Sequence, residues 1–123
     1  MTDSTEQRAR TLRRLLNGER PLDAAIEAIA TLPWDSDEEL VTLTPAHVIN
    51  MLERFVSGEF STTDIERWAD AIEGRDDIAL DAGAADPLRE VIFELANPSI
   101  HAPMTTASAR ALVTRLRAGS SQG

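Results

Sequence analysis

The residues of this sequence that could do chemistry are mainly carboxylates, and the candidate set lies between positions 66 and 81. Three of them are spaced four and three residues apart, which places them on one face of a helix. Carboxylates on such a face suit binding to a positively charged partner, whereas solubility alone is the competing explanation for surplus acid. We expect a partner-binding surface made of Glu66, Asp70, Glu73, Asp76, Asp77 and Asp81.

The sequence contains no pattern that is typical of a catalytic, metal or cofactor site. There is no cysteine, and the only two histidines, His47 and His101, lack the spacing of a zinc motif. Without lysine the chain cannot contain a phosphate-binding loop, and Ser57 precedes a glycine outside any G-x-S-x-G pattern. The acids at 76–81 do not have the spacing of a calcium-binding EF-hand loop. We therefore predict no catalytic residue, no metal, no cofactor and no enzymatic activity.

The net charge of −9 is unevenly distributed along the chain. Residues 1–20 carry a net charge of +2, residues 21–100 carry −14, and residues 101–123 carry +3. An acidic middle repels nucleic acid and anionic lipid and attracts a basic protein. No apolar run approaches the roughly 20 residues that span a bilayer, and the start lacks an apolar leader. We expect a cytoplasmic protein with a basic protein partner, no direct nucleic-acid binding and no membrane contact; the oligomeric state stays open.

The candidate acids must be positioned by a helical hairpin over residues 44–77. Thr44 before a proline is a typical helix start, Gly58 ends that helix, and Ser61 with Asp64 can cap the next one. Apolar residues recur at helical spacing through the hairpin and again after position 87. The predicted core comprises Val48, Ile49, Leu52, Phe55, Ile65, Trp68, Ile72, Leu88, Val91, Ile92 and Leu95.

Four further helical patterns accompany the hairpin, so the sequence predicts an all-α fold, a compact bundle of five to six short helices forming a single domain over 1–123. The first is a basic N-terminal helix whose arginines could dock on the acidic middle of the chain. A tail at 118–123 is expected to fray. The helices outside the hairpin are expected at 5–17, at 21–32, at 87–96 with Asp86 as its cap, and after Thr105 or Thr106.

Residues 33–43 and 75–86 are predicted to be loops. The apolar run from Leu40 to Leu43 could be extended, but a lone strand of four residues would have no partner in the sequence, so we expect no sheet. Trp34 stands beside four acids within 35–39, and tryptophan is enriched at binding hot spots. It could anchor an interface or pack over the helix ends.

The stretches RFVSGEFSTTDIERWADAIEGRDDI, REVIFELANPSI and MTTASARALVTRL are similar to a group of small bacterial proteins that share a "GE-S…WA…IEGR-DI…IFELANP" pattern. This likeness spans residues 44–117 and implies no biochemical role. The shorter stretch SGEFSTTDIERW resembles the all-helical immunity proteins of the colicin D type over about twenty residues. That resemblance implies a helical bundle whose acidic face fills the basic active site of a tRNA-cutting toxin. The extra N-terminal helical pair departs from that pattern, so individual inhibitory residues do not carry over.

Two hypotheses of function follow. The preferred one is an acidic, immunity-type inhibitor that occupies the basic cleft of a toxin nuclease. The alternative is a helical adaptor or regulator that binds through an apolar groove, or a homodimeric interaction module. Salt-sensitive association favours the first, and a contiguous exposed apolar patch favours the second.

Overall fold

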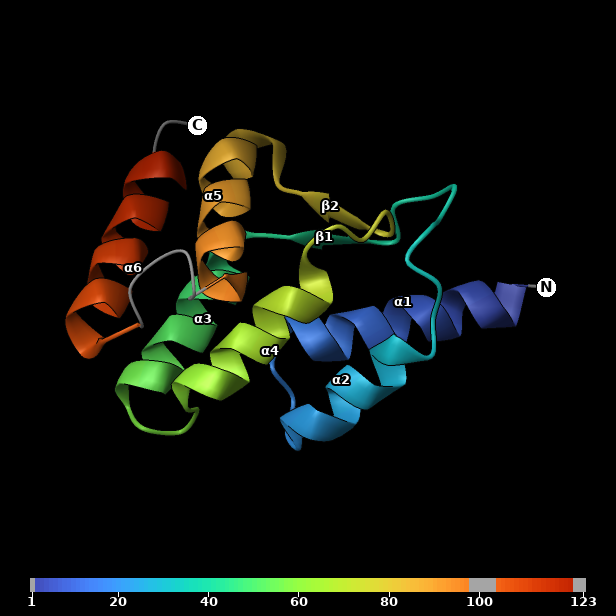
Figure 1. Cartoon of the computed structure of the whole chain (residues 1–123). Coiled ribbons are helices and arrows are strands. Elements are labelled where there is room, and N and C mark those ends of the chain that lie inside the picture. The colour runs from blue at the N-terminus through green and yellow to red at the C-terminus, as the bar shows by residue number, and fades with distance from the viewer. Residues whose placement is uncertain (1, 98–103, 121–123) are drawn as a thin grey trace.

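The structure is a computed structural model that describes residues 2–97 and 104–120 of the chain. Within those residues, six short α-helices pack around one core, and a small two-stranded sheet lies along the upper side in Figure 1. The prediction of an all-α bundle is confirmed. The helices are α1 (Thr2–Leu16), α2 (Leu22–Ala30), α3 (Pro45–Val56), α4 (Thr62–Ile72), α5 (Ala85–Ala96) and α6 (Thr106–Ser120).

The central hairpin of α3 and α4 forms as its sequence predicts. The Ser61 side chain accepts a hydrogen bond from the Asp64 backbone N–H at 3.1 Å, and the Asp64 carboxylate accepts one from the Ser61 N–H at 2.9 Å. This reciprocal cap satisfies two donors at the start of α4. At the start of α3, the Thr44 N–H donates to Nδ1 of His47 at 3.0 Å, and burial lowers the pKa of that imidazole. In both caps, the backbone N–H of the N-cap residue donates to the side chain of the residue three positions later.

The sheet contradicts the prediction of two plain loops. Strand β1 (Val41–Leu43) pairs in parallel with β2 (Ile78–Leu80), with Val41 opposite Ile78. The two strands are joined through the whole α3–α4 hairpin, so neither has a partner close by in the sequence. A parallel pair requires such a crossover connection, which local patterns do not reveal.

Several helix ends also differ from the predictions, including those of α5 and α6. A short 3₁₀ turn (Ala82–Ala84) leads directly into α5, so Asp86 lies in the first turn of the helix and is not its cap. The helix α6 continues to Ser120, so residues 118–120 are helical where fraying was expected. The last three residues of the expected tail lie outside the described part of the chain.

The core forms where the helices face one another. The main packed pairs are α1 with α2, α4 with α5, and α6 with α3. Nine of the eleven predicted core residues are buried, whereas Ile49 and Phe55 are half-buried and Met51 is buried without having been predicted. The indole N–H of the fully buried Trp68 donates to the Leu15 carbonyl oxygen at 2.7 Å, which ties α4 to α1.

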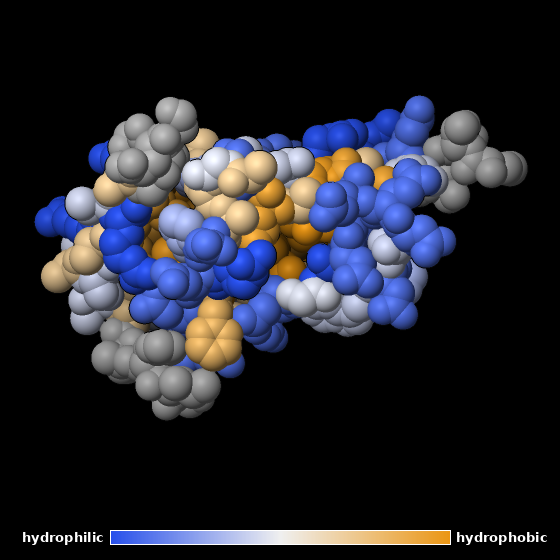
Figure 2. Space-filling view, turned by 90° about the horizontal axis from the view of Figure 1, so that it is seen from above, coloured by the Kyte–Doolittle hydropathy of each residue, from blue (hydrophilic) through white to orange (hydrophobic). Residues whose placement is uncertain are grey.

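The outer surface is largely polar. Seen from above, hydrophilic residues cover most of the visible face, and hydrophobic residues show in its middle (Figure 2). Among the described residues, Trp34 and Phe93 are the large apolar side chains with strong exposure, at 49% and 44%. Single exposed apolar residues are normal on protein surfaces, so exposure alone does not mark either residue as a binding site.

Gly18, directly after α1, offers a test of the packing between α1 and α3. Its φ is +63°, and an added Cβ would lie 2.7 Å from Nη1 of Arg54 and closer still to the sulfur of Met51. We expect Gly18→Ala to lower the free energy of unfolding by about 2–4 kcal/mol, because left-handed strain adds to overpacking. Gly58→Ala is the matched control, since Gly58 has φ +89° but no neighbouring atom within 4 Å. Equal losses in urea unfolding of the two variants would contradict the close packing.

Candidate partner-binding surface

The acids of α4 lie where the sequence places them, on the solvent side of the helix. Asp70 is exposed, and Glu66 and Glu73 are half-buried. None of the three forms an ion pair with another described residue. The one cation between them, Arg67, instead pairs with Asp23 on α2. The α4 face therefore keeps its negative charge.

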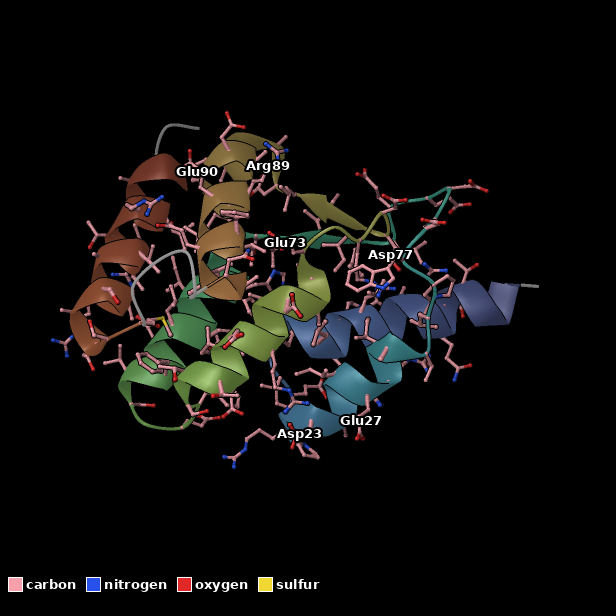
Figure 3. All side chains as sticks on the ribbon, in the orientation of Figure 1. Asp23, Glu27, Glu73, Asp77, Arg89 and Glu90 are labelled. Carbon is pink, nitrogen blue, oxygen red and sulfur yellow. The ribbon has the colours of Figure 1, made fainter. Side chains whose placement is uncertain are left out.

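Asp77 does not belong to the exposed set. Its side chain has no solvent exposure, and both of its oxygens accept hydrogen bonds from arginines. Arg75 donates from Nε to Oδ1 at 3.0 Å and from Nη2 to Oδ2 at 3.1 Å, while Arg8 of α1 donates from Nε to Oδ2 at 2.9 Å. Figure 3 shows Asp77 beside α1, in the segment that joins α4 to β2. The carboxylate is a structural counter-ion for two cations, so the surface prediction was wrong for this residue.

The same two arginines fix the segment that follows α2. Arg8 and Arg75 each donate to the Pro33 carbonyl oxygen at 2.9 Å, and Arg8 also donates to that of Asp35 at 3.1 Å. The Asp76 N–H donates to the Trp34 carbonyl oxygen at 3.1 Å. Residues 33–35 are thereby held alongside residues 75–77, although about forty positions separate them in the sequence. The expected docking of the basic N-terminal helix on the acidic middle thus occurs through Arg8.

Trp34 sits at the centre of this arrangement. Its ring lies 5.0 Å from the guanidinium carbon of Arg75, a cation–π contact, and nearly half of the side chain stays exposed. Beside it is a hollow of about 190 Å³ between α2 and α4. The side chains that line the hollow are Ile26, Ile29, Ala30, Trp34, Arg67, Asp70, Ala71 and Arg75.

We name the exposed and half-buried residues gathered here the Trp34 surface. Asp70 lines the hollow together with the ring, Asp35 follows Trp34 in the chain, and the Asp76 N–H bonds to the Trp34 carbonyl oxygen, while Glu73 follows the end of α4. None of these four acids has an ion pair to a described residue, and the exposed acids Asp37, Glu38 and Glu39 continue the negative charge along the loop. In the sequence, Trp34 with the acids that follow it and the acids between 66 and 81 are separate candidates. No local pattern indicates that the two segments lie close together. The Trp34 surface consists of Trp34, Asp35, Asp70, Glu73 and Asp76.

Of the other predicted residues, Glu66 lies beside this surface and Asp81 lies away from it. Glu66 is one helical turn before Asp70 and extends the acidic face along α4. Asp81 follows β2, roughly 13 Å along the strand from Asp77 by strand geometry, and its side chain accepts from the Gly83 N–H at 3.2 Å. Asp81 therefore caps the 3₁₀ turn and lies apart from the Trp34 surface.

Comparisons of this chain with protein-family models, with curated proteins and with solved structures give no match. Within the described residues, no helix has both the length and the apolar content needed to cross a membrane. The same part of the chain holds no group of three or more side chains that could ligate a metal together.

The buried ion cluster predicts a large effect of Asp77→Asn on stability. Removing the charge leaves Arg75 buried without its counter-ion, which costs about 3–5 kcal/mol of unfolding free energy in buried pairs. Asp76→Asn, at the neighbouring exposed acid, is the control and should change stability by less than about 0.5 kcal/mol. Urea unfolding followed by circular dichroism measures both. Similar values for the two variants would show that Asp77 is not a buried counter-ion.

The cluster also predicts a dependence of stability on pH. Burial raises the pKa of Asp77, but hydrogen bonds from Arg75 and Arg8 lower it by more, so it lies below its ordinary value of 3.8. The unfolded chain therefore takes up this proton first as the pH falls. The stabilisation is complete above pH 3.8 and is lost as the pH falls through the folded pKa. Carbon-13 NMR of the Asp77 carboxyl group tests this, and a titration at or above the ordinary value would refute it.

Proposed function

We propose that this protein binds a basic partner protein through the Trp34 surface, as an immunity-type inhibitor that occupies the basic cleft of a toxin nuclease. The proposal rests on one observation, that the arginines near this surface are already paired with carboxylates of the same chain. Arg8 and Arg75 are bound to buried Asp77 and to backbone carbonyl oxygens, and Arg67 is bound to Asp23. Asp70, Glu73 and Asp76 consequently keep a negative charge that is available to another molecule.

Acids elsewhere on the described surface are more often neutralised within the chain. On α5 and α6, Arg115 pairs with both Glu90 and Glu94, and Arg89 pairs with Asp86. Arg54 pairs with Glu59 at the turn between α3 and α4. The unpaired acids of the Trp34 surface therefore contrast with the paired acids of α5 and of the α3–α4 turn.

This combination of charge and aromatic area suits binding to a nuclease cleft. Uncompensated carboxylates speed encounter with a basic surface and favour the correct partner, while a half-exposed tryptophan supplies apolar contact area at low entropic cost. A nuclease cleft is basic because it binds phosphate groups. The resemblance of SGEFSTTDIERW to colicin D-type immunity proteins supports the same choice of partner, since that stretch forms the turn and the beginning of α4.

The alternative function, an adaptor or homodimer that uses an apolar surface, has one candidate contact residue, the exposed Phe93 on α5. This side chain lies on a different helix from the Trp34 surface. Sedimentation velocity over a wide range of protein concentrations separates the two proposals. An inhibitor of the kind proposed remains monomeric, whereas a homodimer through α5 dissociates in the Phe93→Ser variant.

The test of the proposed function is inhibition of a captured nuclease. The tagged chain is used to co-purify its partner from the native host, and the partner's cleavage of tRNA is measured with and without the chain. We expect stoichiometric inhibition that weakens steeply between about 0.05 and 0.3 M salt, because the contacts are between charges. The triple variant Asp70→Asn, Glu73→Gln and Asp76→Asn should weaken inhibition by about a hundredfold, at roughly 1 kcal/mol for each charge.

The matched control is Glu27→Gln. Glu27 is an exposed acid on α2, without an ion pair to a described residue, on the lower side of the molecule in Figure 3. It should inhibit as the unmodified chain does. Loss of inhibition in this control to the same extent as in the triple variant, or a partner that is neither basic nor inhibited, would overturn the proposal.

A further inference from the structure

We infer that the hollow beside Trp34 receives one long basic side chain of the partner, an arginine or a lysine. The inference rests on the proposed function in that both assign binding to the same surface, and it specifies the group that is bound. Three observations support it: the volume of the hollow, the chemistry of its lining and the charges around it.

The size of the hollow limits what can enter. Its volume of about 190 Å³ is below the 300 Å³ at which pockets for small-molecule ligands typically begin. It lies between α2 and α4, and Trp34 with Arg75 forms one wall. A space of this size suits a single extended side chain, and it is too small for a helix or a cofactor.

The lining favours an occupant with an apolar stem. Ile26, Ile29, Ala30 and Ala71 supply aliphatic surface, and the exposed part of the Trp34 ring adds an aromatic one. The methylene groups of arginine and lysine pack on such surfaces while the charged end stays near water. The inner part of the hollow therefore suits the stem, and the head group lies at the rim.

The charges at the rim select a cation. Arg67 and Arg75 line the hollow, but each already has a carboxylate partner, in Asp23 and Asp77. Asp70 also lines it and is exposed without an ion pair to a described residue. A purely apolar occupant would desolvate the Asp70 carboxylate without compensation, and an acidic one would be repelled. A basic head group satisfies Asp70 and lies near the Trp34 ring, whose π-system attracts cations.

The test uses the full chain labelled with nitrogen-15 and short capped peptides as probes. The sequence contains two tryptophans, so the spectrum has two indole N–H signals. Trp68 is buried and bonded to Leu15, and serves as an internal reference, while Trp34 reports on the hollow. The probes are Gly-Ser-X-Ser-Gly peptides in which X is arginine, lysine, citrulline, norleucine or glutamate. Citrulline keeps the length of arginine without its charge, and norleucine keeps the apolar stem of lysine.

We expect the arginine and lysine peptides to shift the Trp34 indole signal in a saturable way, while the Trp68 signal stays in place. Asp70→Asn should weaken this binding about twofold to fivefold, the range for an exposed ion pair. Glu27→Gln, which removes an acid that does not line the hollow, should leave it unchanged. In Trp34→Ala, the arginine peptide should no longer perturb the amide signals of Ala30 and Ala71.

Three results would overturn the inference: no shift of the Trp34 signal, an equal shift with citrulline or norleucine, or equal weakening by Asp70→Asn and Glu27→Gln. Each is separable from failure of the proposed function. Inhibition of a nuclease that persists when the arginine peptide leaves Trp34 unperturbed refutes the occupant alone. Peptide binding at Trp34 without any inhibited nuclease refutes the proposed function alone.

Discussion

The arrangement of this protein depends on one buried carboxylate held between two arginines. Asp77 has no exposure, and its bonds to Arg75 and Arg8 join the segment after α4 to the first helix of the chain. The same guanidinium groups also donate to the carbonyl oxygens of Pro33 and Asp35. A buried charge is tolerated only where it is paired and hydrogen-bonded, so these contacts must form together. Their formation places the loop, the sheet and α1 relative to one another.

The same contacts determine how charge is distributed on the surface. A chain with a net charge of −9 has few cations to spare, and two of those nearest the Trp34 surface are bound to Asp77. The acids around Trp34 are left without partners for that reason. Binding to a basic molecule would supply the missing countercharge. A structural requirement of the fold thus leaves the acids of the Trp34 surface available for the basic partner that we propose.

The aromatic residues divide into two roles. Trp68 is fully buried and bonded to Leu15, so it stabilises the contact between α4 and α1. Trp34 is half-exposed and bound to Arg75 through its ring, so its position is defined although much of its area faces solvent. A rigidly held, partly exposed tryptophan loses little conformational entropy on binding. This is the physical basis for treating Trp34 as an anchor.

The sequence by itself determined the helices, the caps of α3 and α4, and most of the core, because these follow from local spacing and short-range hydrogen bonds. The capping pair Ser61 and Asp64 and the apolar stripe around Trp68 are examples. The position of Glu66 and Asp70 on the outer side of α4 was also predictable from helical periodicity. Only the tertiary structure decided the pairing of β1 with β2, the burial of Asp77 and the approach of Trp34 to Asp70. Each of these joins residues far apart in the chain, and such contacts depend on packing and charge pairing that no local pattern records.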